Sequence, residues 1–151
     1  MSNVTFQVES FSKVRPEVNE LILAHWEEIA LNKDTVPLDP DWDTYYKADA
    51  GGVLHLVTAR DGEKLVGYSV YIVTTNLHYR SLTVADTDIF YLSPSYRKGM
   101  CGVRLIKFSE ESLKGRGVNK IITKAKLHNQ VGSLLEKIGY TPIETVYAKS
   151  I

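Results

Sequence analysis

Two carboxylates occupy alternate positions in an apolar, strand-like run of residues. Asp86 and Asp88 precede Phe90 and Leu92 in the segment Val84–Leu92, and strict alternation predicts that all four side chains lie on one face of a strand. A carboxylate on such a face is costly unless it is paired or functional. A positioned carboxylate can take the proton of an attacking ammonium group, so the segment could supply a general base. The alternative is that both groups lie at the wet end of the strand and cap loops.

A basic turn that contains glycine follows this strand and opens a predicted helix at about 102–114. It reads Ser93-Pro94-Ser95-Tyr96-Arg97-Lys98-Gly99-Met100-Cys101-Gly102. The first N–H groups of a helix lack partners and carry partial positive charge, and glycine lets a backbone approach a phosphate closely. The turn is therefore a candidate anion site, to which Arg97 and Lys98 add charge. The alternative is a plain strand-to-helix turn with two exposed cations.

The pattern of the whole chain predicts one mixed α/β domain over residues 1–151. Strands are expected at 4–8, 53–59, 64–74, 84–92, 120–124 and 143–149, and helices at 15–32, within 41–50, at 102–114 and at about 130–138. The pair Asp61-Gly62 predicts a hairpin turn between the second and third strands. With 44% apolar and 24% charged residues, the composition argues against wholesale disorder.

Several classes of protein are disfavoured by the same sequence. One Cys excludes an intramolecular disulfide, the opening MSNVTFQVES lacks the pattern of a secretion signal, and no apolar run approaches the length of a membrane span. We therefore expect a cytoplasmic protein. The four His and one Cys show no metal-ligand spacing, so no metal is expected.

The formal net charge of zero conceals an acidic first part and a basic second part. Residues 1–92 carry 7 Lys and Arg against 14 Asp and Glu, whereas residues 93–151 carry 11 against 4. Such asymmetry can mark two ligands of opposite charge, and it can equally reflect ordinary solvated faces.

Two segments together resemble the GCN5-related N-acetyltransferase (GNAT) family. The family's phosphate-binding segment, roughly V-x-P-x-Y-R-x-x-G-x-G-x-x-L, is matched at Leu92, Pro94, Tyr96, Arg97, Gly102 and Leu105. Its later segment, N-x-x-A-x-x-L-Y-E-K-L-G-F, is matched or nearly matched at Leu134, Glu136, Lys137, Ile138, Gly139 and Tyr140. These motifs cover about residues 86–140. The resemblance implies a central mixed sheet flanked by about four helices.

The resemblance also implies an acetyl-CoA-dependent N-acetyltransferase, in which an amine attacks the thioester directly and Cys101 need not be a nucleophile. The pantetheine would run between strands 84–92 and 120–124, which splay apart in this family. The implied cofactor-binding residues are Leu92, Arg97, Lys98, Gly99, Met100, Cys101, Gly102, Val103, His128 and Asn129. Asp88 falls where many members carry an acidic base, and Asp86 is the second candidate. A backbone N–H at Leu92 or its neighbour would polarise the carbonyl.

Three residues depart from the family pattern. Met100 stands where the first glycine of the loop pair is expected, and His128 replaces the asparagine that heads the later segment, with Asn129 one residue on. Leu135 replaces a tyrosine that often protonates the leaving thiolate, so either another donor serves or the thiolate leaves unassisted. Leu135 and Met100 favour a rival interpretation, a catalytically silent module that keeps the coenzyme A turn and binds a partner protein; Asp88 disfavours it.

The acceptor is predicted from residues 27–49, which lie in the part of this fold that walls the acceptor side. They hold seven acidic residues against two lysines. An acidic wall would attract cations and repel phosphates, so a small amine, a polyamine or a protein amine is expected, and nucleic acid is disfavoured. Variant details, such as Arg-Lys-Gly followed by Leu-Ile-Lys-Phe, also resemble acetyltransferases of tailed bacteriophages, for which an amine on modified nucleic acid is an alternative acceptor. A homodimer is a candidate assembly that the sequence does not decide, and no membrane partner is expected.

Overall fold

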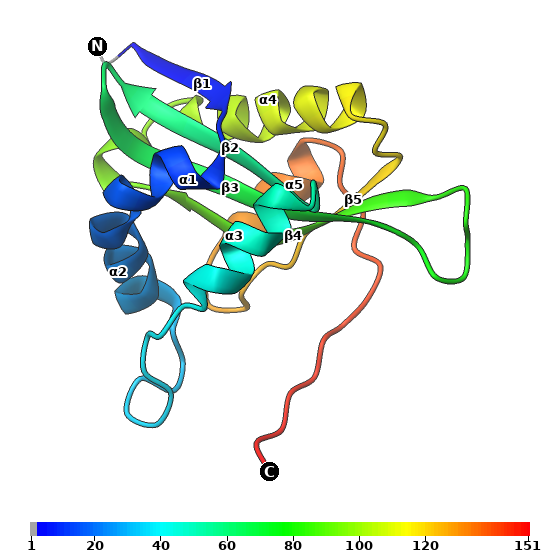
Figure 1. The fold of residues 1–151 in the computed structure, drawn as a ribbon. Coiled ribbons are helices and arrows are strands. Elements are labelled where there is room, and N and C mark those ends of the chain that lie inside the picture. The colour runs from blue at the N-terminus through cyan, green and yellow to red at the C-terminus, as the bar shows by residue number, and fades with distance from the viewer. Residues whose placement is uncertain (1–2) are drawn as a thin grey trace.

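The computed structural model describes residues 3–151 and contains a five-stranded sheet with helices against both faces (Figure 1). Along the chain the strands are β1 (Val4–Val8), β2 (Leu54–Asp61), β3 (Lys64–Thr75), β4 (Thr83–Leu92) and β5 (Lys120–Ile122). They lie in the same order across the sheet, antiparallel except for β4 and β5, which are parallel. The mixed sheet confirms the α/β class predicted from the sequence.

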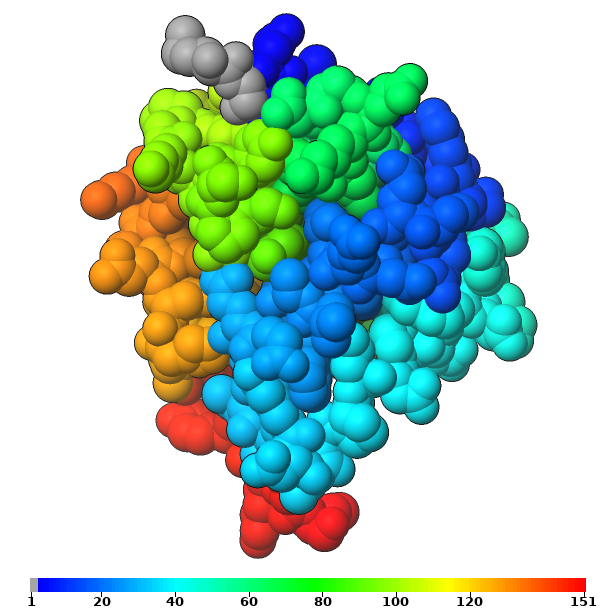
Figure 2. Space-filling model, turned by 90° about the vertical axis from the view of Figure 1, so that its left-hand side faces the viewer, coloured from blue at the N-terminus to red at the C-terminus, as the bar shows by residue number. Residues whose placement is uncertain are grey.

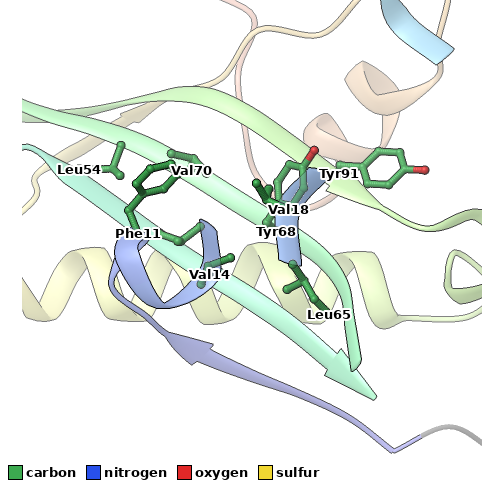
Figure 3. Packing of buried hydrophobic residues seen from close by; sticks show 9 residues of the cluster. Phe11, Val14, Val18, Leu54, Leu65, Tyr68, Val70 and Tyr91 are labelled. Carbon is green, nitrogen blue, oxygen red and sulfur yellow. The ribbon is translucent and has the colours of Figure 1, made fainter. Parts of the chain in front are cut away.

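The helices divide between the two faces of this sheet. They are α1 (Phe11–Val14), α2 (Val18–Ile29), α3 (Trp42–Ala50), α4 (Cys101–Gly115) and α5 (Val131–Lys137). On one face, α1 and α2 bury Phe11, Val14 and Val18 against sheet residues such as Tyr68 (Figure 3), and α3 packs on the same cluster. On the other face, α4 inserts the fully buried Leu105. None of the described helices is long and apolar enough to cross a membrane.

The position of α3 is fixed by local chemistry at its start and its end. Asp41 precedes the helix, and its Oδ1 accepts a hydrogen bond from the Thr44 backbone N–H at 3.0 Å, which satisfies one of the helix's free donors. Near the end of the helix, Asp49 Oδ2 accepts from the Phe11 backbone N–H at 3.0 Å. The helix is therefore tied to α1 and cannot easily slide along the sheet.

A buried network of charges joins β1, β2 and the turn that leads into α2. Arg60 donates from Nε to Glu9 Oε2 at 2.8 Å and from Nη2 to Glu17 Oε2 at 2.8 Å. It also donates to the Glu63 carbonyl at 2.7 Å, and Thr58 donates to Glu9. Arg60 and Glu9 are both buried, so this network replaces the water that their charges lose on folding.

The predicted elements agree with the structure along most of the chain, with two differences. Helix α1 is absent from the prediction, because four residues are too few to show a helical period. The expected strand at 143–149 is wrong: residues 141–151 are extended but belong to no strand. Alternation along a segment does not by itself make a strand, because a strand also needs a neighbour to complete its hydrogen bonds.

Candidate active site

Strand β4 and the segment that follows β5 diverge and leave a cavity between them. They pair only over residues 84–86 of β4 and 120–122 of β5. Beyond this point a cavity of about 530 Å³ opens, lined by Asp86–Phe90 of β4 and Thr123–Lys126 after β5. His25 of α2 and Leu135 of α5 also contribute to its wall. The divergence that the family resemblance implied for strands 84–92 and 120–124 therefore occurs between β4 and the residues after β5, because β5 ends at Ile122, and a space of substrate size lies between them.

A β-bulge at Asp88 shapes the wall of this cavity. Val70 of β3 pairs with Ile89, whereas the next residue, Tyr71, pairs with Thr87, so Asp88 is the additional residue. A bulge shifts the side-chain alternation by one position and redirects the side chain that it carries. The sequence prediction that Asp86 and Asp88 share one face with Phe90 and Leu92 is consequently wrong.

The two carboxylates lie on the face covered by α1–α3, while the two apolar residues lie on the α4 face. Asp86 pairs across the sheet with Ile72, whose side chain packs toward α1–α3. Phe90 and Leu92 instead pack against the cluster beneath α4. The carboxylates are thus removed from the apolar surroundings that alternation would have given them.

Tyr45 of α3 holds the bulge carboxylate. Its hydroxyl donates to Asp88 Oδ2 at 2.6 Å, and its ring stacks on Phe11 with centroids 5.2 Å apart. Burial, followed by the neighbouring Asp88, raises the pKa of the Tyr45 hydroxyl, which therefore stays protonated and acts as a donor. Within residues 3–151 no hydrogen bond engages Asp88 Oδ1, so this oxygen can receive a proton from a ligand.

Asp86 has a different environment because a lysine neutralises it. Lys124, which follows β5, places Nζ 3.2 Å from Asp86 Oδ2. Beside this pair the hydroxyls of Thr87 and Thr123 lie 2.9 Å apart and connect the two strands where they begin to separate. Asp88 is consequently the carboxylate with the freer oxygen.

His25 is a cavity residue that sequence reasoning did not single out as functional. It is buried, its ring stacks on Tyr91 at 4.9 Å, and its Nδ1 lies 3.2 Å from the Tyr68 hydroxyl. Burial lowers the pKa of His25 to about 4, so the imidazole is neutral near pH 7. The only sequence signal was a histidine within the apolar stripe of α2, which is as typical of a core residue as of a ligand.

The turn between β4 and α4 leaves its backbone donors open. Gly99 adopts φ 73°, a conformation that favours glycine, and Lys98, Gly99 and Met100 are exposed. Among the described residues, no backbone partner is found outside α4 for the N–H groups of residues 98–103. A Cβ added at Gly102 would have one near neighbour, Leu92 Cδ2 at 4.0 Å. The turn therefore has the open backbone that a pyrophosphate requires.

Arg97 connects this turn to α2. Its two terminal nitrogens donate to the Glu28 carboxylate at 2.6 Å each, and its Nε donates to the Leu92 carbonyl at 2.7 Å. Figure 2 shows this side of the molecule, where the yellow-green turn lies against the blue atoms of α2. Glu28 offsets the charge of Arg97, so the backbone and Lys98 are better placed than Arg97 to meet a phosphate.

The remaining predicted site residues are distributed unevenly around the cavity. Asn129 lines it and accepts from the Val131 backbone N–H at 3.2 Å, whereas His128 is exposed and outside its wall. Leu92 is buried under α4 and is likewise not part of the wall. Burial raises the pKa of the Cys101 thiol, so this cysteine is not activated. Residues 3–151 contain no group of three or more His, Cys, Asp or Glu side chains that could hold a metal.

Comparison with known proteins identifies the family. The model of the Acetyltransferase (GNAT) family matches residues 17–140. The chain belongs to this family. As a GNAT protein it is an enzyme, an N-acetyltransferase. A search of curated proteins finds no significant match.

Solved structures with the same fold span nearly the whole chain. An aminoglycoside acetyltransferase from an uncultured soil metagenomic sample, in complex with trehalose, has a TM-score of 0.77 at 13% identity, over 98% of this chain and 95% of that chain. A ribosomal-protein-alanine N-acetyltransferase from Brucella melitensis has a TM-score of 0.72 at 16% identity, over 98% of this chain and 99% of that chain. A glucosamine-6-phosphate N-acetyltransferase from Arabidopsis thaliana has a TM-score of 0.70 at 12% identity, over 98% of both chains. At these identities the similarity shows the GNAT fold.

Proposed function

We propose that this GNAT protein transfers the acetyl group of acetyl-CoA directly to an amine, with Asp88 as the general base. The observation that carries the proposal is the bulge carboxylate, which faces the cavity between the splayed strands with one oxygen free. The turn at residues 98–103 would hold the pyrophosphate through its N–H groups, and the pantetheine would reach the bulge along the cavity.

In the proposed reaction the acceptor ammonium first loses a proton to Asp88, directly or through one water. The amine nitrogen then bonds to the thioester carbon, and the carbon–sulfur bond breaks as the tetrahedral intermediate collapses. The products are an acetamide, coenzyme A thiolate and two protons, one held by Asp88 and one lost from the new amide nitrogen. A backbone N–H of β4 near the bulge would stabilise the oxyanion.

The departing thiolate has no tyrosine at the usual family position. Leu135 lines the cavity there and cannot donate a proton. A thiolate is a fairly good leaving group near neutral pH, so we propose that it leaves unassisted or takes a proton from water. His25 is neutral and occupied on Nδ1 by Tyr68, which makes it a wall residue in this scheme.

The acceptor is proposed to be a cationic amine, either small or on a protein. Four of the seven acidic side chains in residues 27–49 have internal partners: Glu27 pairs with Lys33, Glu28 with Arg97, Asp41 caps α3 and Asp49 binds Phe11. The three that stay exposed and without a hydrogen-bond or ion-pair partner in residues 3–151 are Asp34, Asp39 and Asp43. The acidic wall is therefore smaller than the sequence alone suggested.

Salt should weaken recognition of a cationic acceptor through these three carboxylates. For a diamine acceptor we expect KM to rise about threefold between 0.05 and 0.5 M NaCl, because screening acts on exposed charges. The triple variant Asp34→Asn, Asp39→Asn, Asp43→Asn should already have a higher KM than the wild type at 0.05 M NaCl. Its KM should then change little as the salt concentration rises. Steady-state kinetics measures both, and a KM that does not change with salt in the wild type removes the acidic wall from acceptor binding.

A bulky side chain at Gly102 should block the cofactor turn without unfolding the protein. Gly102→Leu places a side chain in the open space at the start of α4 and is expected to raise the dissociation constant of acetyl-CoA at least about tenfold. Gly115→Leu is the matched control, because it lies in the same helix with no atom within 4 Å of an added Cβ. Calorimetric titration gives the affinities and thermal melting checks the fold; equal affinities for the two variants would mean that the turn does not hold the cofactor.

The proposal is tested by calorimetry with acetyl-CoA and then by thiol release over a panel of amines, including a polyamine, an amino sugar and a peptide amine. Binding together with turnover on one class supports it. Binding of acetyl-CoA without turnover on any acceptor would favour the silent module, the interpretation that Leu135 and Met100 support. Turnover only on an amine of modified nucleic acid would select that alternative acceptor. The cytoplasmic location and the bacteriophage origin remain predictions.

A further inference from the structure

Four charged side chains line the cavity between β4 and the segment that follows β5, two of each sign. Asp86 and Lys124 form an ion pair at 3.2 Å and neutralise each other. Asp88 accepts a hydrogen bond from the uncharged Tyr45 hydroxyl, so its negative charge is not balanced. Within residues 3–151 no hydrogen bond or ion pair engages the Lys126 ammonium group. The cavity therefore contains one unbalanced negative charge and one unbalanced positive charge.

Alternation places the Lys126 side chain on the side of the sheet where the two carboxylates lie. Lys124 reaches Asp86 on that side. The next side chain points the other way, because a Cβ placed on Gly132 of α5 would lie 3.6 Å from the Cβ of Ala125. In a chain whose side chains alternate, Lys126 returns to the side of Lys124. Lys126 and the carboxylates of β4 consequently project from the two opposite walls of one cavity, toward the same face.

The environment of His25 independently places the Lys126 charge close to α2. His25 lines the same cavity. Burial lowers the pKa of its imidazole, the Glu28 carboxylate opposes this effect, and the positive charges of Arg97 and Lys126 add to it. A charge acts on a neighbour in this way over a short range, since water and salt screen distant exposed charges. The Lys126 ammonium group therefore lies near the α2 side of the cavity and contributes to the potential that a ligand meets there.

The proposed position of acetyl-CoA leaves the Lys126 charge unused. The turn at residues 98–103, which would hold the pyrophosphate, is not part of the cavity wall, and the pantetheine chain that would enter the cavity is uncharged. The acceptor is then the ligand that meets both Asp88 and Lys126. A diamine would bring a second positive charge near Lys126, which is repulsive, whereas an anionic group on the acceptor would be attracted.

We infer that the acceptor is an amine that also carries an anionic group, either a carboxylate or a phosphate, and that Lys126 determines this specificity. The ammonium group of the acceptor lies at Asp88, where its proton is taken, and the anionic group accepts a hydrogen bond from the Lys126 ammonium group. This inference rests on the proposed function and narrows its acceptor class. The three exposed carboxylates of residues 27–49 are not part of the cavity wall, so they act on the approach of the ammonium group and not on the bound acceptor.

The test compares acceptors that differ in the anionic group alone. Amino acids are paired with their carboxamides, glucosamine 6-phosphate is paired with glucosamine, and a diamine is included. For the wild type, kcat/KM from thiol release should be at least about tenfold higher for the anionic member of one of these pairs. The carboxylate pairs and the phosphate pair then show which anionic group the site takes.

Variants of Lys126 test whether this residue causes the preference. Lys126→Met should lower kcat/KM for the anionic acceptor about tenfold and change it less than about twofold for the counterpart without the anionic group, and Lys126→Arg should restore most of the rate. Lys126→Glu should shift the preference toward the diamine. Lys137→Met is the matched control, because Lys137 is exposed on α5 and is not part of the cavity wall.

Calorimetry with acetyl-CoA separates this inference from the proposed function. Lys126→Met should bind acetyl-CoA within about twofold of the wild type, and a larger loss would assign Lys126 to the cofactor and overturn the inference. A wild type that prefers the members without an anionic group, or a preference that Lys126→Met leaves unchanged, would overturn it as well, while turnover on any of these amines upholds the proposed function. Absence of turnover on all of them, with acetyl-CoA bound, contradicts the proposed function and with it the inference.

Discussion

Replacing Asp88 by Asn is expected to lower kcat about 100- to 1,000-fold while the dissociation constant of acetyl-CoA changes less than about twofold. The amide keeps the shape of the side chain and its place in the bulge but cannot accept a proton from the acceptor. The turn at residues 98–103, where we propose that the cofactor binds, is not part of the cavity wall and makes no hydrogen bond with Asp88, so the affinity for acetyl-CoA should not change.

Thiol-release kinetics and calorimetry on the same preparation check both parts of this prediction. Glu111→Gln is a suitable control, since it removes an exposed carboxylate of α4 that is not part of the cavity wall. Raising the pH should restore part of the lost rate, because the acceptor then arrives as a free amine. If Asp88→Asn turns over at the wild-type rate, the base lies elsewhere, and Asp86 becomes the next residue to test.

Removing the Tyr45 hydroxyl tests whether this group acts on the reaction through Asp88 or only stabilises the fold. Tyr45→Phe keeps the ring stacked on Phe11 and removes only the donor to Asp88, so kcat should fall about tenfold while the dissociation constant of acetyl-CoA changes less than about twofold. In the Asp88→Asn background the same change should have no further effect, which a double-mutant cycle measures. Tyr46→Phe is the control, because Tyr46 is on the same helix and contacts Phe11 edge-on without touching Asp88.

The elements that form the candidate site could be predicted from the sequence, but the geometry of its side chains could not. The strand–turn–helix order around residues 92–102 is a local pattern, so the turn, its glycines and the start of α4 were all predictable. The bulge at Asp88 is not local: it arises from the register between β3 and β4, and a one-residue shift reverses the facing of every later side chain. Asp86 and Asp88 were therefore selected by an argument from alternation that the structure contradicts, and their roles stay a prediction.

Long-range ion pairs were similarly invisible in the sequence. Arg97 and Glu28 are 69 residues apart, and only the folded chain shows that α2 takes up the charge of the turn. The acidic stretch at 27–49 appeared uniform because partners such as Arg97 and the Phe11 N–H lie elsewhere in the chain. Charge counts by segment consequently overestimate the charge that a ligand would meet.

Replacing Arg60 by Met is expected to lower the free energy of unfolding by about 3–5 kcal/mol, the largest stability effect that we predict for a single substitution. The change keeps an apolar side chain of similar length but leaves Glu9, only 7% exposed, as a buried carboxylate without its main partner. Glu17 also loses a partner, which loosens the entry to α2. Urea unfolding measures the loss, and Arg80→Met, in an exposed loop, should change stability by less than about 0.5 kcal/mol.

The pH dependence of this loss identifies Glu9 as its cause. Burial alone would raise the pKa of the Glu9 carboxyl, but hydrogen bonds from Arg60 and Thr58 outweigh it and lower the pKa from 4.5 to about 2. A lowered pKa contributes stability that is present above pH 4.5 and lost as the pH falls toward 2. In Arg60→Met burial prevails, so Glu9 takes up a proton at a higher pH and becomes neutral in its buried position. The stability gap between wild type and Arg60→Met should therefore narrow as the pH falls from 7 to about 3. A gap that stays constant over this range would show that the loss comes from packing around Arg60, not from the buried charge of Glu9.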